Sequence, residues 1–225
     1  MLQHNFTGPT AQEFLLTLCP SSLDSLKPFT STLSVLLNEQ GGIIDDTIIT
    51  KHSDSAFYVV TNAGRSVEDK AHISQKLEEW NAAHKGREVK WETLEGWGLL
   101  ALQGPKAKDV LQRVTDQDLN KVKFGSSVFA DIKTMDGQTV KCHVARGGYT
   151  GEDGFEVRSC PFLSASHFIS PLTPSLRYRF LQSILSLFPT PSLLIPTSCL
   201  SVLALEILSV SKPVCVSTAT ILTKA

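Results

Sequence analysis

The segments GPTAQEFL (residues 8–15) and GPKAKDVL (residues 104–111) share glycine, proline, alanine and leucine at the same four positions. Proline directly after a glycine is typical of the first turn of a helix, so both segments are expected to begin helices. A glycine-containing turn between apolar segments follows each copy, which predicts a β-hairpin after each helix. A strand, a helix and a hairpin used twice indicate an α+β fold of two half-units. Chance similarity of two proline-started helices is the alternative.

The remaining stretches before residue 158 predict short strands and one longer helix. NEQGG (residues 38–42) and the Asp-Gly step at residues 136–137 are typical of hairpin turns. A helix is expected from Ser66, with one stripe made of Val67, Ala71, Ser74, Leu77 and Trp80. The expected strands cover residues 34–37, 43–49, 57–60, 89–91, 99–102, 128–133 and 138–144.

Charge and cysteine content argue against several classes of protein. The 225 residues carry 21 basic and 22 acidic side chains, so a net charge of −1 offers no basic field to nucleic acid. The five cysteines form no Cys-x-x-Cys pair, and the six histidines show no metal-ligand spacing. We therefore expect no disulfide framework, no metal site and a reducing compartment. The first six residues show neither a secretory nor a transit pattern.

The composition changes near Arg158. All 14 glycines and 21 of the 22 acidic residues precede residue 159, and the net charge is −4 before this point and +3 after it. Residues 159–225 are rich in Leu, Ser and Pro and sustain no period of 2 or 3.6. Three prolines interrupt their most apolar stretch, residues 181–210, which argues against a membrane span. We expect one domain over residues 1–158 and an irregular tail over residues 159–225.

The first motif that could carry chemistry is GGIIDD at residues 41–46. Adjacent side chains of a strand point to opposite faces, so one of Asp45 and Asp46 is expected inside and the other in solvent. An inward carboxylate after a double-glycine turn can polarise an amine. An ordinary strand with polar flanking residues is the alternative, and the alternation does not say which aspartate points inward.

The second motif is RGGYTGEDGFE at residues 146–156. Its four glycines permit positive φ angles and close backbone approach to a ligand. Tyr149 offers an aromatic face, and the Glu156 carboxylate can accept two hydrogen bonds from an amino-heterocycle such as a pterin. No Lys-Ser/Thr pair follows the glycines, which argues against a phosphate site. A long structural loop is the alternative.

Taken together, these motifs resemble a known family. NEQGGIIDDTII (38–49), YVVTNAG (58–64), LQGP (102–105) and RGGYTGEDGFE (146–156) occur in the order and spacing of the glycine cleavage system T-proteins, which are aminomethyltransferases. The resemblance covers about residues 1–157. It implies a folate-binding α+β fold built from ferredoxin-like βαββ half-units, incomplete in this chain.

The resemblance also implies an activity and its residues. The one-carbon unit passes from the aminomethyl-lipoyl arm of the H-protein to tetrahydrofolate, which gives 5,10-methylenetetrahydrofolate, ammonia and reduced lipoyl H-protein. Asp46 resembles the catalytic carboxylate near folate N10, and Glu156 resembles the pterin-binding glutamate. Asn62 and Tyr149 resemble residues that line the folate pocket. The family implies a mitochondrial location, with no metal, no nucleic acid and no membrane among its partners.

The family pattern extends beyond this chain on both sides. Upstream residues with a transit peptide, and downstream a GARDSLRLEAG segment and a barrel domain, are expected in the family and are not visible here. The codons permitted for residues 203–224, read from the third base of Leu203, allow GARDSLRLEAGLCLYGND. We therefore predict that residues from about Ser159 onward derive from a retained intron or a frameshift.

Two other functions stay open from the sequence alone. The chain can be a non-catalytic folate-binding fragment. It can also be a folate-dependent relative, either an iron–sulfur assembly factor or the folate domain of a dimethylglycine or sarcosine dehydrogenase. NEQGGIIDD together with YVVTNAG favours the T-protein family.

Overall fold

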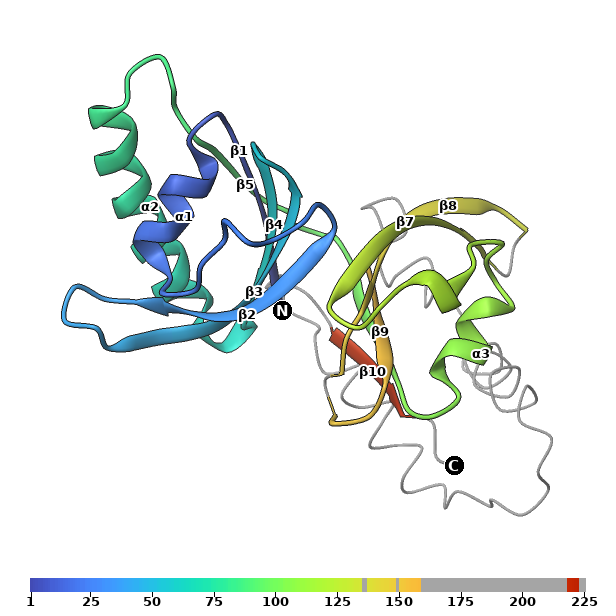
Figure 1. The fold of residues 1–225 in the computed structure, drawn as a ribbon. Helices are drawn as coiled ribbons and strands as arrows, with labels where there is room; N and C mark the ends of the chain where they lie inside the picture. The colour runs from blue at the N-terminus through green and yellow to red at the C-terminus, as the bar shows by residue number, and fades with distance from the viewer. Residues whose placement is uncertain (135–136, 149, 159–217, 223–225) are drawn as a thin grey trace.

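The computed structural model describes residues 1–134, 137–148, 150–158 and, as backbone, 218–222. These residues form two half-units joined by one continuous sheet (Figure 1). The first half-unit contains β1 (Leu2–Thr7), α1 (Ala11–Leu18), β2 (Thr30–Leu37), β3 (Ile43–Ser53), β4 (Ala56–Thr61), α2 (Ser66–Ala83) and β5 (Lys90–Thr93). The second contains β6 (Leu99–Gln103), α3 (Ala107–Gln112), β7 (Ser126–Lys133), β8 (Thr139–Arg146) and β9 (Gly154–Arg158). Short 3₁₀ turns lie at Ala63–Arg65 and Leu119–Lys121, and β10 covers Thr218–Leu222.

The strand order repeats from one half-unit to the other. The sheet runs β10-β6-β9-β8-β7-β2-β3-β4-β1-β5, so β7-β8-β9-β6 mirrors β2-β3-β4-β1 about the β2–β7 junction. At that junction Thr30 of β2 pairs with Ser126 of β7. The register also repeats, since Phe6 pairs with Phe57 in β1–β4 and Leu102 pairs with Phe155 in β6–β9. The α+β fold of two half-units is thus confirmed.

The two Gly-Pro segments adopt the same backbone geometry. Gly8 and Gly104 have φ angles of 143° and 121°, which strongly favour glycine. The amide of Gly8 donates to the carbonyl of Ser55, and the amide of Gly104 donates to the carbonyl of Asp153, each at 2.9 Å. Ser55 and Asp153 are the residues directly before β4 and β9. The shared sequence therefore marks a structural duplication and not a chance similarity.

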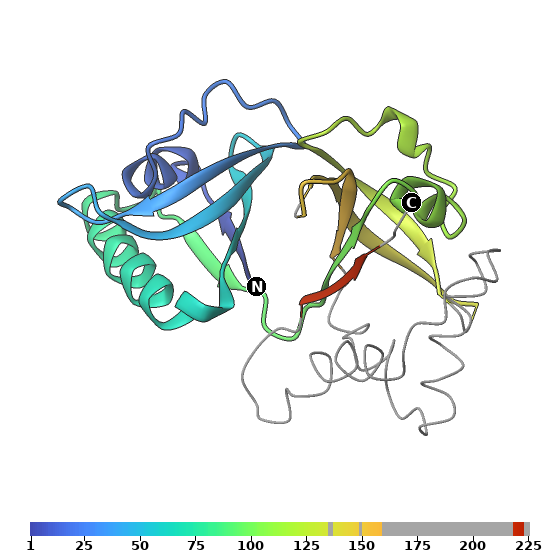
Figure 2. The same ribbon diagram turned by 90° about the horizontal axis from the view of Figure 1, so that it is seen from below.

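Each half-unit packs its helices on one face of its own part of the sheet. Figure 2 shows α1 and α2 on the outside of the first half-unit and α3 on the outside of the second. The first core contains Phe6, Phe14, Ile49 and Phe57 beneath its helices. The second contains Leu111, Val144, Phe155 and Val157. The faces opposite the helices, called here the inner faces, meet between the half-units.

Two sequence expectations need correction. The expected strands included β4 but not its counterpart in the second half-unit, β9. The glycine-rich motif ends in β9, so Glu156 lies in a strand. On α2, Val67 is 77% exposed, and the buried stripe consists of Asp69 and Ile73 followed by the partly buried Leu77 and Trp80. Only the N-terminal part of the expected stripe, Val67 and Ala71, therefore points away from the sheet, whereas Leu77 and Trp80 pack against the core as expected.

Candidate functional site

The two adjacent aspartates of β3 lie on opposite faces of the sheet. Asp45 shares the helix-covered face with Thr47 and Ile49 and is 7% exposed, whereas Asp46 is exposed. Asp46 shares the inner face with Ile48, which pairs in register with Val60 of β4. Packing of α1 and α2 on one face of the sheet settles the orientation that strand alternation left open.

Asn62 holds both aspartates at once. Its backbone amide donates to Oδ2 of Asp45 at 2.8 Å, and its side-chain Nδ2 donates to Oδ1 of Asp45 at 3.0 Å. The same Nδ2 donates to Oδ1 of Asp46 at 2.6 Å. Both hydrogens of the amide group are therefore used, one on each carboxylate. The structure brings Asn62 and Asp46 together and adds Asp45 as a third member.

Asp69 is a buried acid of α2 that the sequence did not reveal. It is fully buried in the first turn of α2, and neither carboxyl oxygen has a hydrogen-bond partner within the described residues. Burial, opposed by the Thr61 hydroxyl and assisted by the charge of Asp45, raises the pKa of Asp69 to about 7. The one available signal was an aspartate in line with Ile73, Leu77 and Trp80 on an amphipathic helix.

Replacing Asp69 by asparagine is expected to stabilise the fold at neutral and alkaline pH but not near pH 4. The pKa of Asp69 is about 7 in the fold against 3.8 in the unfolded chain, so the unfolded chain ionises first as the pH rises. Stability is consequently lost between about pH 4 and about pH 7, and this loss persists above that range. We expect Asp69→Asn to raise the Tm at about pH 8 by at least about 3 °C and to have little effect at about pH 4.

Thermal unfolding followed by circular dichroism at the two pH values measures this effect. Glu78→Gln is the matched control, because Glu78 is an exposed acid of the same helix α2. An equal Tm change at both pH values would show that ionisation of Asp69 plays no part in stability.

Glu156 lies on the inner face of the second half-unit. Its neighbours in β9, Phe155 and Val157, belong to the core beneath α3, so Glu156 and Arg158 point the other way. The Glu156 side chain is half-buried, and burial raises its pKa. No described residue forms an ion pair or hydrogen bond with its carboxylate. Such an acceptor is chemically suited to a ligand that presents two N–H donors.

Aromatic rings and imidazoles join the inner faces of the two half-units. Nε2 of His52 lies 3.3 Å from Nε2 of His143, and the ring of Tyr58 stacks on His52 at 6.2 Å between centroids. The guanidinium of Arg158 lies 4.3 Å from the Tyr58 ring centroid and 5.1 Å from that of Trp97. Burial and the charge of Arg158 lower the pKa of His52 to about 4 and that of His143 to about 3. Of these residues, only Tyr58 belongs to a quoted sequence motif, YVVTNAG.

The glycine-rich motif forms a closed loop between β8 and β9. Nε and Nη2 of Arg146 donate to the two carboxylate oxygens of Asp153 at 3.0 and 2.7 Å, a bidentate pair across the loop. A Cβ atom on Gly148 would lie 2.5 Å from the carbonyl oxygen of Glu152, so the closure requires glycine there. The loop thereby fixes where β9 begins. Tyr149, which was expected to line the folate pocket, lies outside the described residues.

The comparisons with known proteins agree with this architecture. The family model for the GCVT N-terminal domain matches residues 1–168. The chain belongs to this family. Within the GCVT family, the mitochondrial "probable aminomethyltransferase" of Schizosaccharomyces pombe is 44% identical over 180 residues, which are 80% of this chain and 43% of the relative. The mitochondrial aminomethyltransferase of Mesembryanthemum crystallinum is 47% identical over 150 residues, 67% of this chain and 35% of the relative.

A solved structure of a GCVT relative shares the fold. The crystal structure of the glycine cleavage system aminomethyltransferase T from Bartonella henselae superposes with a TM-score of 0.61 and 33% identity. The match covers 77% of this chain and 44% of that protein. The chain thus spans less than half the length of the relatives that it matches.

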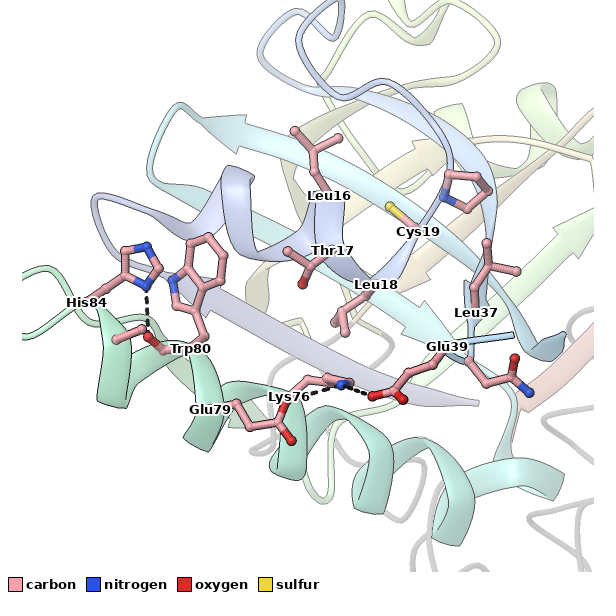
Figure 3. A pocket seen from close by; sticks show the side chains of 13 residues that line it. Leu16, Thr17, Leu18, Cys19, Leu37, Glu39, Lys76, Glu79, Trp80 and His84 are labelled. Carbon is pink, nitrogen blue, oxygen red and sulfur yellow. Dashed lines mark hydrogen bonds and ion pairs between the residues drawn. The ribbon is translucent and has the colours of Figure 1, made fainter. Parts of the chain in front are cut away.

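A surface hollow lies away from these residues. It has a volume of about 560 Å³ between α1, α2 and the β2–β3 turn. Inside it, Nζ of Lys76 contacts Glu39 at 2.8 Å and Glu79 at 3.1 Å, and Trp80 stacks on His84 (Figure 3). None of the predicted site residues lines the hollow. Its charges are paired with one another, so it does not replace the inner face as the candidate site.

The structure also bears on metal and membrane association. Within the described residues, no three or more His, Cys, Asp or Glu side chains gather in a way that would hold a metal ion. Among the helices of that same part of the chain, none has the length and apolar character needed to cross a membrane.

Proposed function

We propose that this chain forms the folate-binding part of an aminomethyltransferase of the glycine cleavage system. The reaction transfers the one-carbon unit from the aminomethyl-lipoyl arm of the H-protein to tetrahydrofolate and releases ammonia. The observation that carries the proposal is the pair of carboxylates on the two inner faces. Asp46 is exposed and is oriented by the Asn62 amide, and Glu156 is half-buried in β9. The names of the curated relatives support the same activity and a mitochondrial location.

Each residue has a distinct part in the proposed reaction. Glu156 accepts the two N–H donors of the pterin ring, and its partial burial strengthens these bonds. Asp46 lies near N10 of folate and orients the reacting amine, while Asn62 lines the pocket and holds Asp46 in place. Tyr149 provides an aromatic surface for the ligand. Positioning and polarisation account for most of the rate enhancement, with no metal ion required.

Binding of tetrahydrofolate is expected to depend on Glu156. Loss of the carboxylate leaves two pterin donors unpaired, so Glu156→Ala should weaken the binding free energy by about 1–3 kcal/mol. This change corresponds to a Kd that is about 5- to 150-fold higher. Quenching of tryptophan fluorescence during titration with tetrahydrofolate measures the Kd.

Glu152→Ala is the matched control for this titration, because Glu152 belongs to the same loop and is exposed. Its Kd should equal that of the unsubstituted chain. Equal Kd values for the Glu156 variant and the unsubstituted chain would contradict the pterin-binding role of Glu156.

A second candidate function is folate binding without catalysis. The observation in its favour is that the chain spans 43% of the Schizosaccharomyces pombe relative and 35% of the plant relative. Ammonia release coupled to aminomethyl-lipoyl H-protein separates the two functions. Ammonia release that is faster with the chain than without it supports the enzyme. Tetrahydrofolate binding without ammonia release supports the binding fragment.

We also propose that the chain divides at about residue 158 into the folate-binding domain and a tail derived from a retained intron or a frameshift. The change in glycine and acid content supports this division, as does the alternative reading of residues 203–224. Sequencing of the messenger RNA across the junction tests it. A transcript that keeps this frame and yields a stable protein of this mass would contradict the proposal.

A further inference from the structure

Where the backbone ladder between β3 and β4 stops, side chains of β3 continue the hydrogen bonding between the two strands. Ile48 and Val60 form the last pair of this ladder. Beyond that pair, the hydroxyl of Thr47 donates to the carbonyl of Val60 at 2.8 Å. The carboxylate of Asp45 then accepts from the backbone amide of Asn62, also at 2.8 Å. The buried Asp45 side chain thus satisfies a backbone donor that the ladder leaves without a partner.

Asp45 holds the side chain of Asn62 as well as its backbone. Asn62 directly precedes the 3₁₀ turn at Ala63–Arg65, a position where an asparagine side chain often accepts from the backbone amides that follow it. The Asn62 side chain makes no such bond. Its Nδ2 donates instead to Oδ1 of Asp45 at 3.0 Å. Two hydrogen bonds to one carboxylate therefore fix the direction in which the Asn62 side chain points.

The amide group fixed in this way is directed at Asp46. Asp46 and Asn62 lie opposite each other, two residues beyond the last pair of the ladder on their respective strands. Nδ2 of Asn62 donates to Oδ1 of Asp46 at 2.6 Å. Because the amide group is planar and carries two hydrogens, the bond that one hydrogen makes to Asp45 sets the direction of the other hydrogen. The contact between Asp45 and Asn62 consequently determines how Asp46 is held.

We propose that Asp45 is a positioning residue, which through Asn62 orients the carboxylate of Asp46. This inference rests on the proposed function, since it takes Asp46 as the catalytic carboxylate. Asp45 lies on the helix-covered face of β3, so it acts on Asp46 only through Asn62. Its carboxylate offers an acceptor to both donors of Asn62, whereas asparagine in its place offers one acceptor and turns a donor toward the other N–H. The Asn62 side chain then loses its fixed direction, and its bond to Asp46 weakens.

Turnover of Asp45→Asn in the H-protein-coupled assay tests the proposal. We expect kcat to fall about 5- to 10-fold, because one orienting contact of Asp46 is weakened. The KM for tetrahydrofolate should change little, because the proposed pterin contact is made by Glu156 in the other half-unit. A kcat equal to that of the unsubstituted chain would overturn the proposal.

Thr47→Val is the matched control, which separates positioning from a general loss of stability. Thr47 is 1% exposed on the same face of β3, and its hydroxyl donates to Val60 and not to Asn62. Loss of this buried hydrogen bond should lower the Tm, as Asp45→Asn also should, but kcat should stay unchanged. An equal fall of kcat in the two variants would show that Asp45 acts only by stabilising the strand.

A double-mutant cycle tests whether the effect passes through Asn62. Asn62→Ala removes the donor to Asp46, so no further loss remains for Asp45 to cause by this route. The kcat of the variant that carries both Asp45→Asn and Asn62→Ala should be no lower than that of Asn62→Ala alone. Losses that multiply would show that Asp45 acts independently of Asn62, which would overturn the proposal.

The side-chain amide of Asn62 provides a test that does not need turnover. Its two hydrogens, assigned in the NMR spectrum by their loss in Asn62→Ala, should both exchange slowly with solvent in the unsubstituted chain, since both are bonded. Asp45→Asn should accelerate this exchange about 10-fold, and Thr47→Val should not. Fast exchange in the unsubstituted chain, or unchanged exchange in Asp45→Asn, would overturn the proposal. The expected exchange in a chain without turnover would instead support the linkage and contradict the proposed function.

Discussion

Replacing Asp46 by asparagine should lower turnover in the H-protein-coupled assay by about 10²-fold or more, the usual scale for a positioned acid–base group. The substitution keeps the size of the side chain and removes its charge. Asp46 lies on the inner face and receives the 2.6 Å bond from Asn62, so its carboxylate is oriented before any ligand binds. Binding of tetrahydrofolate depends on Glu156 in the other half-unit, and its Kd should stay nearly unchanged.

Asp45→Asn is the matched comparison, since the two aspartates are adjacent in β3. Asp45 faces the helices and is connected to Asp46 only through Asn62. Asp45→Asn should therefore lower turnover much less than Asp46→Asn does. Ammonia release gives the turnover, and the fluorescence titration gives the Kd. Equal losses in the two variants, or a defect at Asp46 confined to binding, would contradict the assignment.

Replacing Phe155 by alanine should remove a large part of the free energy of unfolding of the chain. Phe155 is fully buried beneath α3, and Phe→Ala in such a core costs about 3–5 kcal/mol in transfer free energy and cavity formation. Domains of this size are stable by about 5–15 kcal/mol, so the variant should lose a third or more of the free energy of unfolding. Urea denaturation followed by circular dichroism measures the loss.

Two further variants give this experiment its controls. Phe57 occupies the equivalent position in the first half-unit and is 1% exposed, so Phe57→Ala should cost a similar amount. Phe124 is 70% exposed, so Phe124→Ala should cost little. Contacts of His52, Tyr58, His143 and Arg158 join the inner faces, so we expect one transition in every variant. Separate transitions for the two half-units would show that these contacts do not couple them.

Local sequence patterns predicted most of the elements. The Gly-Pro segments marked the duplication because a positive φ before a helix strongly favours glycine, and proline suits the first helical turn. The turn motif at residues 38–42 and the Asp-Gly step of the sequence predicted the hairpins β2–β3 and β7–β8, since turn chemistry acts over only a few residues. The third hairpin strand β9 was missed because its glycine-rich approach resembles a loop, and only pairing with β6 and β8 defines it as a strand.

The site required more than local patterns. By itself, the sequence determined that two adjacent aspartates lie on opposite faces of one strand and that Asn62 and Glu156 belong to the same family motif set. The tertiary structure alone decided that Asp45 points toward the helices, because that orientation depends on which face α1 and α2 cover. It also decided that Asn62 bridges Asp45 and Asp46, that the His52 ring contacts the His143 ring, and that Asp69 is fully buried. The contacts of Asn62 with Asp46 and of His52 with His143 join residues that are 16 and 91 positions apart in the sequence. Local propensity acts over only a few residues and does not encode such contacts.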